Sequence, residues 1–149
     1  MPPSLQGRAQ KAASQKGYRF RNLYGRLDED FLQQGWRDIR QDAASGVDQV
    51  RAHAYEQHLD EHIHRLVECL KQKRYRATLV RRPARPTGDG SLRPLGIPAV
   101  ADKLLQLAGA RLLEAIDAQD FLGCRYGYRP PVGALDAVDT LTITLPFGR

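Results

Sequence analysis

Residues 81–98, with the sequence RRPARPTGDGSLRPLGIP, constrain the fold of this chain more than any other stretch. Extended arms flank a Thr-Gly-Asp-Gly sequence at residues 87–90, and glycines on both sides of an aspartate favour a tight reversal with positive φ. Pro83, Pro86 and Pro94 have no backbone donor, which suits an edge ribbon and disfavours a central strand. The sequence therefore predicts a protruding, two-stranded β-hairpin.

Positive charge is concentrated at this predicted hairpin and at the N-terminus. The net charge is +6 over residues 1–27, −6 over residues 28–70, +7 over residues 71–95 and −1 over residues 96–149. Such clustering is typical of proteins that neutralise phosphates, although a solvated basic surface has the same signature. The Gly-Asp-Gly reversal likewise suits either backbone amides that bind a phosphate or an ordinary turn. Four arginines project from the hairpin: Arg81, Arg82, Arg85 and Arg93.

The length and composition predict one modest folded domain. The chain has 149 residues, of which 42% are hydrophobic and 27% are charged, as in soluble globular proteins. Residues 1–20 lack apolar periodicity, so we expect a disordered or weakly ordered basic arm, followed by a domain over residues 21–145. The arm has no apolar segment of the secretory type, and we expect a cytoplasmic location with Cys69 and Cys124 as reduced thiols.

Apolar periodicity predicts three principal helices around the hairpin. The first begins after Asp28, a good N-cap, and runs for about four turns until Ser45 and Gly46 stop it. The second covers residues 54–73, and the third covers residues 100–118 with Gly109 in its interior. A short helical pattern follows at residues 133–141, and residues 142–149 have a β-like composition. The second helix has a regular buried stripe: Tyr55, Leu59, Ile63, Leu66 and Leu70.

The chain offers little support for catalysis or metal binding. Residues 58–62, HLDEH, match the HxxEH string of one class of zinc peptidase. Since Leu59 and Ile63 must face the core, His58 and His62 flank a buried stripe, and we expect them to be solvated or capping side chains. The sequence contains no phosphate-binding glycine motif and no nucleophile elbow. No catalytic or metal-ligating residue is predicted.

A second loop, FLGCRYGYRPP at residues 121–131, interleaves cations with aromatic rings. This composition suits contacts with phosphates together with stacking on a sugar or base, although a packed aromatic corner has the same composition. The candidate RNA-binding residues in this loop are Arg125, Tyr126, Tyr128 and Arg129.

The hairpin sequence GDGSLRPLGIPAVADKLLQ and the later FLGCRYGYRP together resemble the group II intron-encoded reverse transcriptases, or maturases. In that family a DGxxRPLGIPxxxDRxxQ block precedes a large hydrophobic helix and an FxxxSYGFRP block. Both blocks occur here in the same order and at matching spacing. An aromatic start at residues 20–27, the SGVD sequence at residues 45–48 and the segment at residues 70–75 extend the resemblance over residues 18–141.

The resemblance implies an α+β fold, namely a helical fingers-like domain with one protruding β-hairpin that closes over template and nucleotide. It places Arg93 near the nucleotide triphosphate, with Arg82 and the segment Leu95, Gly96, Ile97 and Pro98 near the template strand. Arg129 would support this surface, and Arg81, Arg85 and the aromatic loop would contact RNA. A guanidinium suits these roles because it offers several fixed donors to phosphate oxygens without titrating.

The chain departs from the family pattern at two important places. Thr87 stands where the family has a lysine, and the palm aspartates that bind two Mg²⁺ ions in the full-length family would lie after Arg149. We therefore expect a truncated or frame-disrupted product that holds no metal and cannot polymerise alone. Its expected partners are intron or template RNA, a palm-containing polypeptide and, through uncovered apolar helix faces, a second copy. The alternatives are a non-catalytic splicing helper that binds RNA, or a decayed gene fragment without activity.

Overall fold

The computed structural model describes residues 3–15, 17–119, 121–127 and 132–145, and the chain divides into two compact units. One unit contains residues 20–112, and the other combines residues 1–19 with residues 113–149. The division falls inside the domain that the sequence predicts over residues 21–145. Within the described ranges, no helix is both long and apolar enough to cross a bilayer.

Helix α2 (Glu29–Trp36) opens the helical part of the larger unit, after a short 3-10 helix, η1 (Leu23–Arg26). The predicted N-cap is confirmed, because the Asp28 carboxylate accepts a hydrogen bond of 2.9 Å from the Phe31 amide. The predicted length is wrong, since the amides of Asp38 and Ile39 bond to carbonyls three residues back and turn the chain out of the helix. Asp38 then pairs with Arg111 of α5.

The helix predicted over residues 54–73 is two helices, α3 (Ala52–Glu56) and α4 (Leu59–Lys71), with a break at residues 57–58. His58 leaves helical geometry with φ −127° and ψ 38°. The Tyr55 carbonyl accepts a hydrogen bond of 3.4 Å from the His58 amide, three residues on, and His62 Nδ1 lies 3.1 Å from the same oxygen. The predicted stripe is otherwise confirmed, with Leu59 only half-buried and four buried members: Tyr55, Ile63, Leu66 and Leu70.

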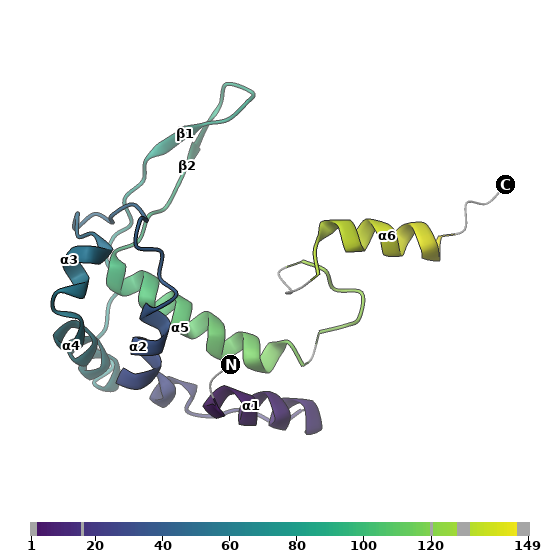
Figure 1. Cartoon of the computed structure of the whole chain (residues 1–149), viewed down its shortest axis with the longest axis horizontal. Coiled ribbons are helices and arrows are strands. Elements are labelled where there is room, and N and C mark those ends of the chain that lie inside the picture. Colours follow the sequence, from purple (N-terminus) through teal and green to yellow (C-terminus); the bar gives the residue numbers. More distant parts are fainter. Residues whose placement is uncertain (1–2, 16, 120, 128–131, 146–149) are drawn as a thin grey trace. The chain divides into compact units, whose positions relative to one another are not determined.

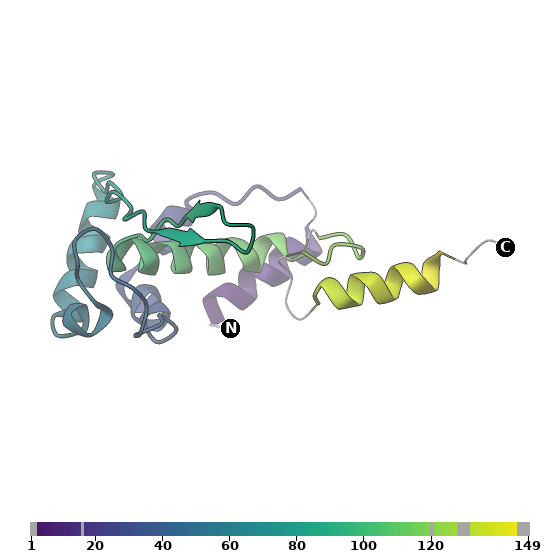
Figure 2. The ribbon, with the colours of Figure 1, turned by 90° about the horizontal axis from the view of Figure 1, so that it is seen from above.

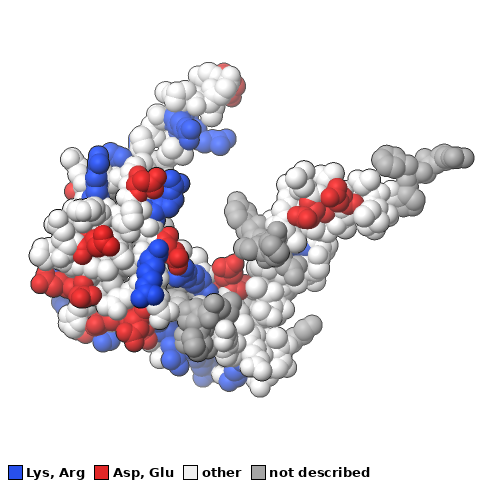
Figure 3. Space-filling view, viewed as in Figure 1, with Lys and Arg blue, Asp and Glu red and all other residues white. Residues whose placement is uncertain are grey.

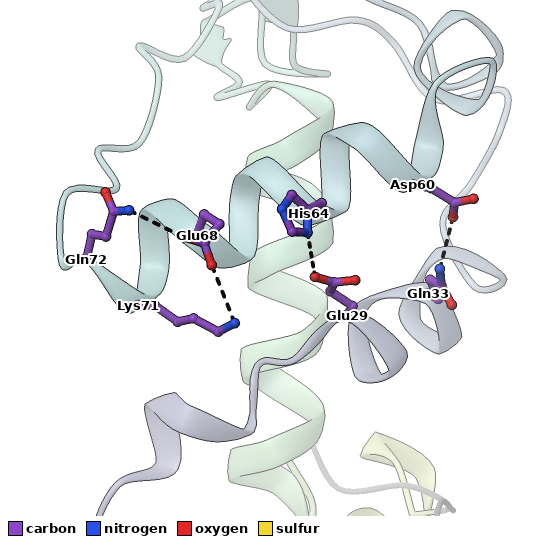
Figure 4. Close-up of polar contacts among 7 residues, drawn as sticks. All are labelled: Glu29, Gln33, Asp60, His64, Glu68, Lys71 and Gln72. Carbon is purple, nitrogen blue, oxygen red and sulfur yellow. Dashed lines mark hydrogen bonds and ion pairs between the residues drawn. The ribbon is translucent and has the colours of Figure 1, made fainter.

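Helices α2 and α4 pack against each other through apolar side chains and two polar contacts at the rim. His64 Nδ1 lies 2.8 Å from Glu29 Oε1, and Gln33 Nε2 donates to Asp60 Oδ1 at 2.9 Å (Figure 4). Helix α5 (Val100–Asp117) supplies the other wall of the core, and its bounds agree with the predicted third helix. The largest fully buried side chains come one from each helix: Leu32, Ile63 and Leu104.

The predicted hairpin is confirmed. Strand β1 (Ala84–Pro86) pairs antiparallel with β2 (Leu92–Pro94), and an isolated bridge between Arg81 and Ile97 extends the pairing toward the base. Gly90 has a φ of 78°, the left-handed conformation expected of the reversal. The strands lie side by side in both views (Figures 1 and 2), and Figure 1 shows the hairpin standing out from helices α2 to α5.

The smaller unit contains α1 (Pro3–Ser14) and α6 (Ala134–Thr144). Much of the arm predicted as disordered or weakly ordered is therefore helical, with Leu5 and Ala12, two turns apart, buried on one face. The β-like reading of residues 142–149 is also wrong for its described part, because Thr142 and Thr144 belong to α6. Their hydroxyls donate to carbonyls four residues back at 2.9 and 2.6 Å, which satisfies them within the helix.

Helices and one small antiparallel hairpin together give a mixed α+β architecture, as the sequence predicts.

Candidate nucleic-acid interface

The register of the hairpin sorts its arginines onto two faces. Cross-strand hydrogen bonds link Thr87 with Ser91 (2.8 Å), Pro83 with Leu95 (2.9 Å), and Arg81 with Ile97 (3.0 and 2.8 Å), at every second residue. Directly opposed residues share a face, and faces alternate along each strand. The partners Arg85 and Arg93 therefore share one face with Arg81, which we call the arginine face. The predicted site residue Arg82 lies on the opposite face, so the hairpin does not bring it together with Arg93.

Arg85 and Arg93 are directly opposed across the hairpin, and both strands are exposed along their whole length. Like charges in this position destabilise a strand pair, by an amount of the order of 0.2–1 kcal/mol. Among the described residues no carboxylate forms an ion pair with these arginines or with Arg81 and Arg82. Figure 3 shows basic side chains along the hairpin and acidic atoms only near its tip. The arginine face is thus an uncompensated cationic surface.

The tip of the hairpin is a self-contained turn. Asp89 Oδ1 accepts hydrogen bonds from the Ser91 hydroxyl (2.9 Å) and the Ser91 amide (3.2 Å), while the Thr87 hydroxyl bonds to the Ser91 carbonyl at 2.8 Å. Hydrogen bonds from the Thr87 and Ser91 side chains lower the pKa of Asp89 to about 2. The amides of Thr87 and Gly90 are bonded to Ser91 and Thr87 carbonyls. These bonds favour a structural turn over a phosphate-binding loop. Thr87 stabilises the turn, since its hydroxyl and its amide both donate to the Ser91 carbonyl.

The base of the hairpin is clamped to the first turn of α5 by Asp102, a residue that sequence reasoning missed. Asp102 is only 3% exposed, and it accepts hydrogen bonds from the Tyr75 hydroxyl and from the Thr78 amide at 3.1 Å. Burial and the hydrogen bond to Asp102 raise the pKa of Tyr75. The signal that could have revealed this clamp is a carboxylate in the first turn of an otherwise apolar helix.

The loop at residues 44–48 supports the same base from another side. A Cβ added to Gly46 would lie 2.7 Å from the Ala99 backbone and 3.0 Å from the Pro98 carbonyl carbon, so only glycine fits there. Lys103 Nζ donates to the Ala44 carbonyl at 2.5 Å. The predicted template segment ends in this support: Leu95 and Gly96 are exposed, whereas Ile97 and Pro98 are half-buried.

The second predicted RNA-binding loop belongs to the smaller unit, where its described residues make internal contacts. The Arg125 guanidinium lies over the Phe121 ring, 3.7 Å from its centroid. The Tyr126 hydroxyl donates to Thr140 Oγ1 of α6 at 2.7 Å. These contacts favour a packed aromatic corner for this part of the loop. Tyr128 and Arg129 lie outside the described residues.

The zinc-peptidase-like string contributes to packing. The His62 ring contacts the Tyr55 ring with centroids 4.2 Å apart, and its Nδ1 serves the Tyr55 carbonyl. His58 lies 3.9 Å from Glu61 across an exposed turn. In the part of the chain that the structure describes, no three His, Cys, Asp or Glu side chains converge as a metal site would require. Cys69 and Cys124 are free thiols.

Comparison with known proteins gives a partial match. No protein-family model matches the chain. The chain is similar to Protein YkfC of Escherichia coli (strain K12), with 34% identity over 100 residues, which is 67% of this chain. The matched region covers 26% of that protein, so the chain spans about a quarter of the length of this curated relative.

Proposed function

We propose that the arginine face of the hairpin binds the phosphate backbone of RNA, and that the chain is a fingers-like part of a group II intron reverse transcriptase or maturase. The observation that carries the first half is the opposed pair Arg85 and Arg93, which has no carboxylate partner among the described residues. A strand pair that keeps two adjacent cations in an exposed ribbon carries a repulsion that an anionic ligand would relieve. Guanidinium groups suit phosphate because they present several donors in a fixed plane.

The anchoring of the hairpin base to α5 is the second reason to propose that the hairpin binds a ligand. Asp102 fixes the chain before β1, and the same first turn of α5 continues directly from the chain after β2. Both ends of the hairpin are therefore anchored to one helix, so the arginines are presented from a defined base. Preorganisation of this kind reduces the ordering cost of binding.

The assignment to a reverse transcriptase rests on the sequence blocks at residues 88–106 and 121–130 and on their spacing. In the proposed arrangement Arg93 approaches a nucleotide triphosphate, while the palm aspartates that bind Mg²⁺ are not among residues 1–149. The 149-residue chain by itself is then expected to bind RNA without extending a primer. DNA synthesis by the purified chain with primer, template and Mg²⁺ would refute the proposal that these residues bind RNA without polymerising DNA.

Salt-dependent RNA binding tests the arginine face directly. We expect Arg85→Gln and Arg93→Gln each to weaken binding to a structured RNA and to reduce the slope of log K against log salt by about one. Arg37→Gln, which removes an equal charge from the exposed end of α2, is the matched control and should change the slope less. Equal losses from all three variants would show non-specific attraction to net charge and would overturn the proposed surface.

A further inference from the structure

A hollow of about 220 Å³ lies beside the base of the hairpin, between α3, α4 and the first turn of α5. Its lining is almost entirely apolar and includes the rings of Tyr55, His62 and Tyr75, with Ala101 as part of the wall from α5. Pockets for drug-sized ligands have volumes of roughly 300–1,000 Å³. This hollow therefore suits one ring system better than a whole ligand.

Two polar side chains among the residues that line the hollow form no hydrogen bond or ion pair with a described residue. The Tyr55 side chain is only 8% exposed, yet its hydroxyl forms no hydrogen bond there. Every buried side-chain nitrogen or oxygen in the described ranges has a partner, so this hydroxyl must keep some accessible surface. Arg65 also lines the hollow and forms no ion pair with a described carboxylate.

These features match the parts of a single nucleotide. Aromatic side chains stack on bases, a hydroxyl with some accessible surface can bond to a base edge, and a guanidinium at the rim can contact the attached phosphate. Arg65 is close enough to Tyr55 to oppose the effect of burial, which nonetheless raises the pKa of the Tyr55 hydroxyl to about 12. The hydroxyl is therefore protonated at neutral pH and can donate a hydrogen bond.

We infer that this hollow receives one unstacked nucleobase of the RNA that the arginine face binds, with Arg65 on its phosphate. The choice of a nucleobase over other planar groups rests on the proposed function. The hollow would add a base contact to a hairpin whose own contacts are with the backbone. Such a contact favours single-stranded or bulged RNA, because a paired base cannot leave its stack without cost.

The chain carries its own probe for this inference. Trp36 is the single tryptophan, and its ring stacks on Tyr55 with centroids 5.5 Å apart. A base that enters the hollow should change Trp36 fluorescence. We expect a saturable response to adenosine 5′-monophosphate and little response to ribose 5-phosphate, which has the phosphate without the base. A similar response to both compounds would overturn the inference, as would binding of phenol without binding of the nucleotide.

Three variants of the full chain separate the parts of the site. Ala101→Leu fills the hollow and should weaken nucleotide binding about fivefold to hundredfold, the range that base stacking contributes. Tyr55→Phe keeps the ring and the core packing, and Arg65→Gln removes only the charge and the end of an exposed side chain, so both should fold normally while binding the nucleotide more weakly. Unchanged affinity in these two conservative variants would refute the site even if Ala101→Leu failed to fold.

The two proposals can fail independently. Arg85→Gln combined with Arg93→Gln should abolish most RNA binding and leave the nucleotide response of Trp36 intact. If the nucleotide binds as expected but these hairpin substitutions leave RNA affinity unchanged, the hollow is supported and the arginine face is refuted. If RNA affinity falls while the nucleotide gives no response, the hollow is refuted and the arginine face stands.

Discussion

Replacement of Gly46 by alanine tests how the hairpin base is held. Gly46 is buried and does not have a positive φ, so alanine could adopt its backbone conformation and only the close approach is at issue. The new Cβ would lie 2.7 Å from both Cα and N of Ala99, about 0.8 Å inside the 3.5 Å at which carbon contacts become favourable. Backbone atoms cannot rotate away, so the loop at residues 44–48 or the start of α5 must move.

We expect this overlap to reduce the free energy of unfolding by about 1–3 kcal/mol, the usual cost of overpacking. Gly109→Ala is a matched control, since it adds the same methyl group in the interior of α5, where no atom other than the neighbouring backbone of the helix lies within 4 Å. It should stabilise the chain by about 0.5–1 kcal/mol, because alanine favours a helix interior over glycine.

Urea unfolding followed by circular dichroism and by Trp36 fluorescence measures both changes. Opposite signs for the two glycines are the expected result. A Gly46→Ala variant within 0.5 kcal/mol of the parent chain would show that the loop does not press on α5, and the proposed rigid base of the hairpin would lose this support.

Two further predictions concern the ends of the hairpin. Asp102→Ala should cost about 2–3 kcal/mol in urea unfolding, because it leaves the Tyr75 hydroxyl and the Thr78 amide without their charged acceptor; a cost below 1 kcal/mol would argue against the clamp. Asp89 has a pKa of about 2, below its unfolded value of about 3.9, so its stabilisation of the tip is complete above pH 4 and is lost as the pH falls toward 2. The amide chemical shifts of Thr87 and Ser91 should change over this pH range. If the same change persisted in Asp89→Asn, the transition could not be due to the Asp89 carboxylate.

Local signals in the sequence predicted the features that depend on neighbouring residues. The Gly-Asp-Gly reversal forms with Gly90 at positive φ, and Asp28 caps α2 as its position suggests. The break at residues 57–58 had no such signal, because its compensation comes from His62, a full turn into the next helix. The early end of α2 had no such signal either: the amides of Asp38 and Ile39 bond three residues back, and Asp38 pairs with Arg111, far along the chain.

The composition of the arginine face depends on the strand register, which the sequence does not specify residue by residue. A slip of one position would exchange the faces of Arg81 and Arg82, since side chains alternate with a period of two. The register is fixed by the tip, where Thr87, Asp89 and Ser91 bond to one another. Sequence reasoning could therefore identify the arginines but grouped Arg82 with Arg93, which the hairpin places on opposite faces.

This separation of faces leads to a prediction about energetic coupling. If Arg85 and Arg93 bind the same phosphate group, removal of one already disrupts the site, so the double variant should lose less RNA affinity than the sum of the single losses. Residues that share a ligand typically show interaction energies of about 0.5–3 kcal/mol, whereas independent sites add within about 0.5 kcal/mol.

The pair Arg82 and Arg93 provides the comparison within the same hairpin, because the two side chains leave the ribbon on opposite faces. Glutamine variants of each arginine and of both pairs, measured by RNA binding at fixed salt, complete two double-mutant cycles. We expect coupling for Arg85 with Arg93 and near-additivity for Arg82 with Arg93. The opposite result would be coupling between Arg82 and Arg93 without coupling between Arg85 and Arg93. It would contradict the register, because the RNA would then contact Arg82 and Arg93 together and not the arginine face.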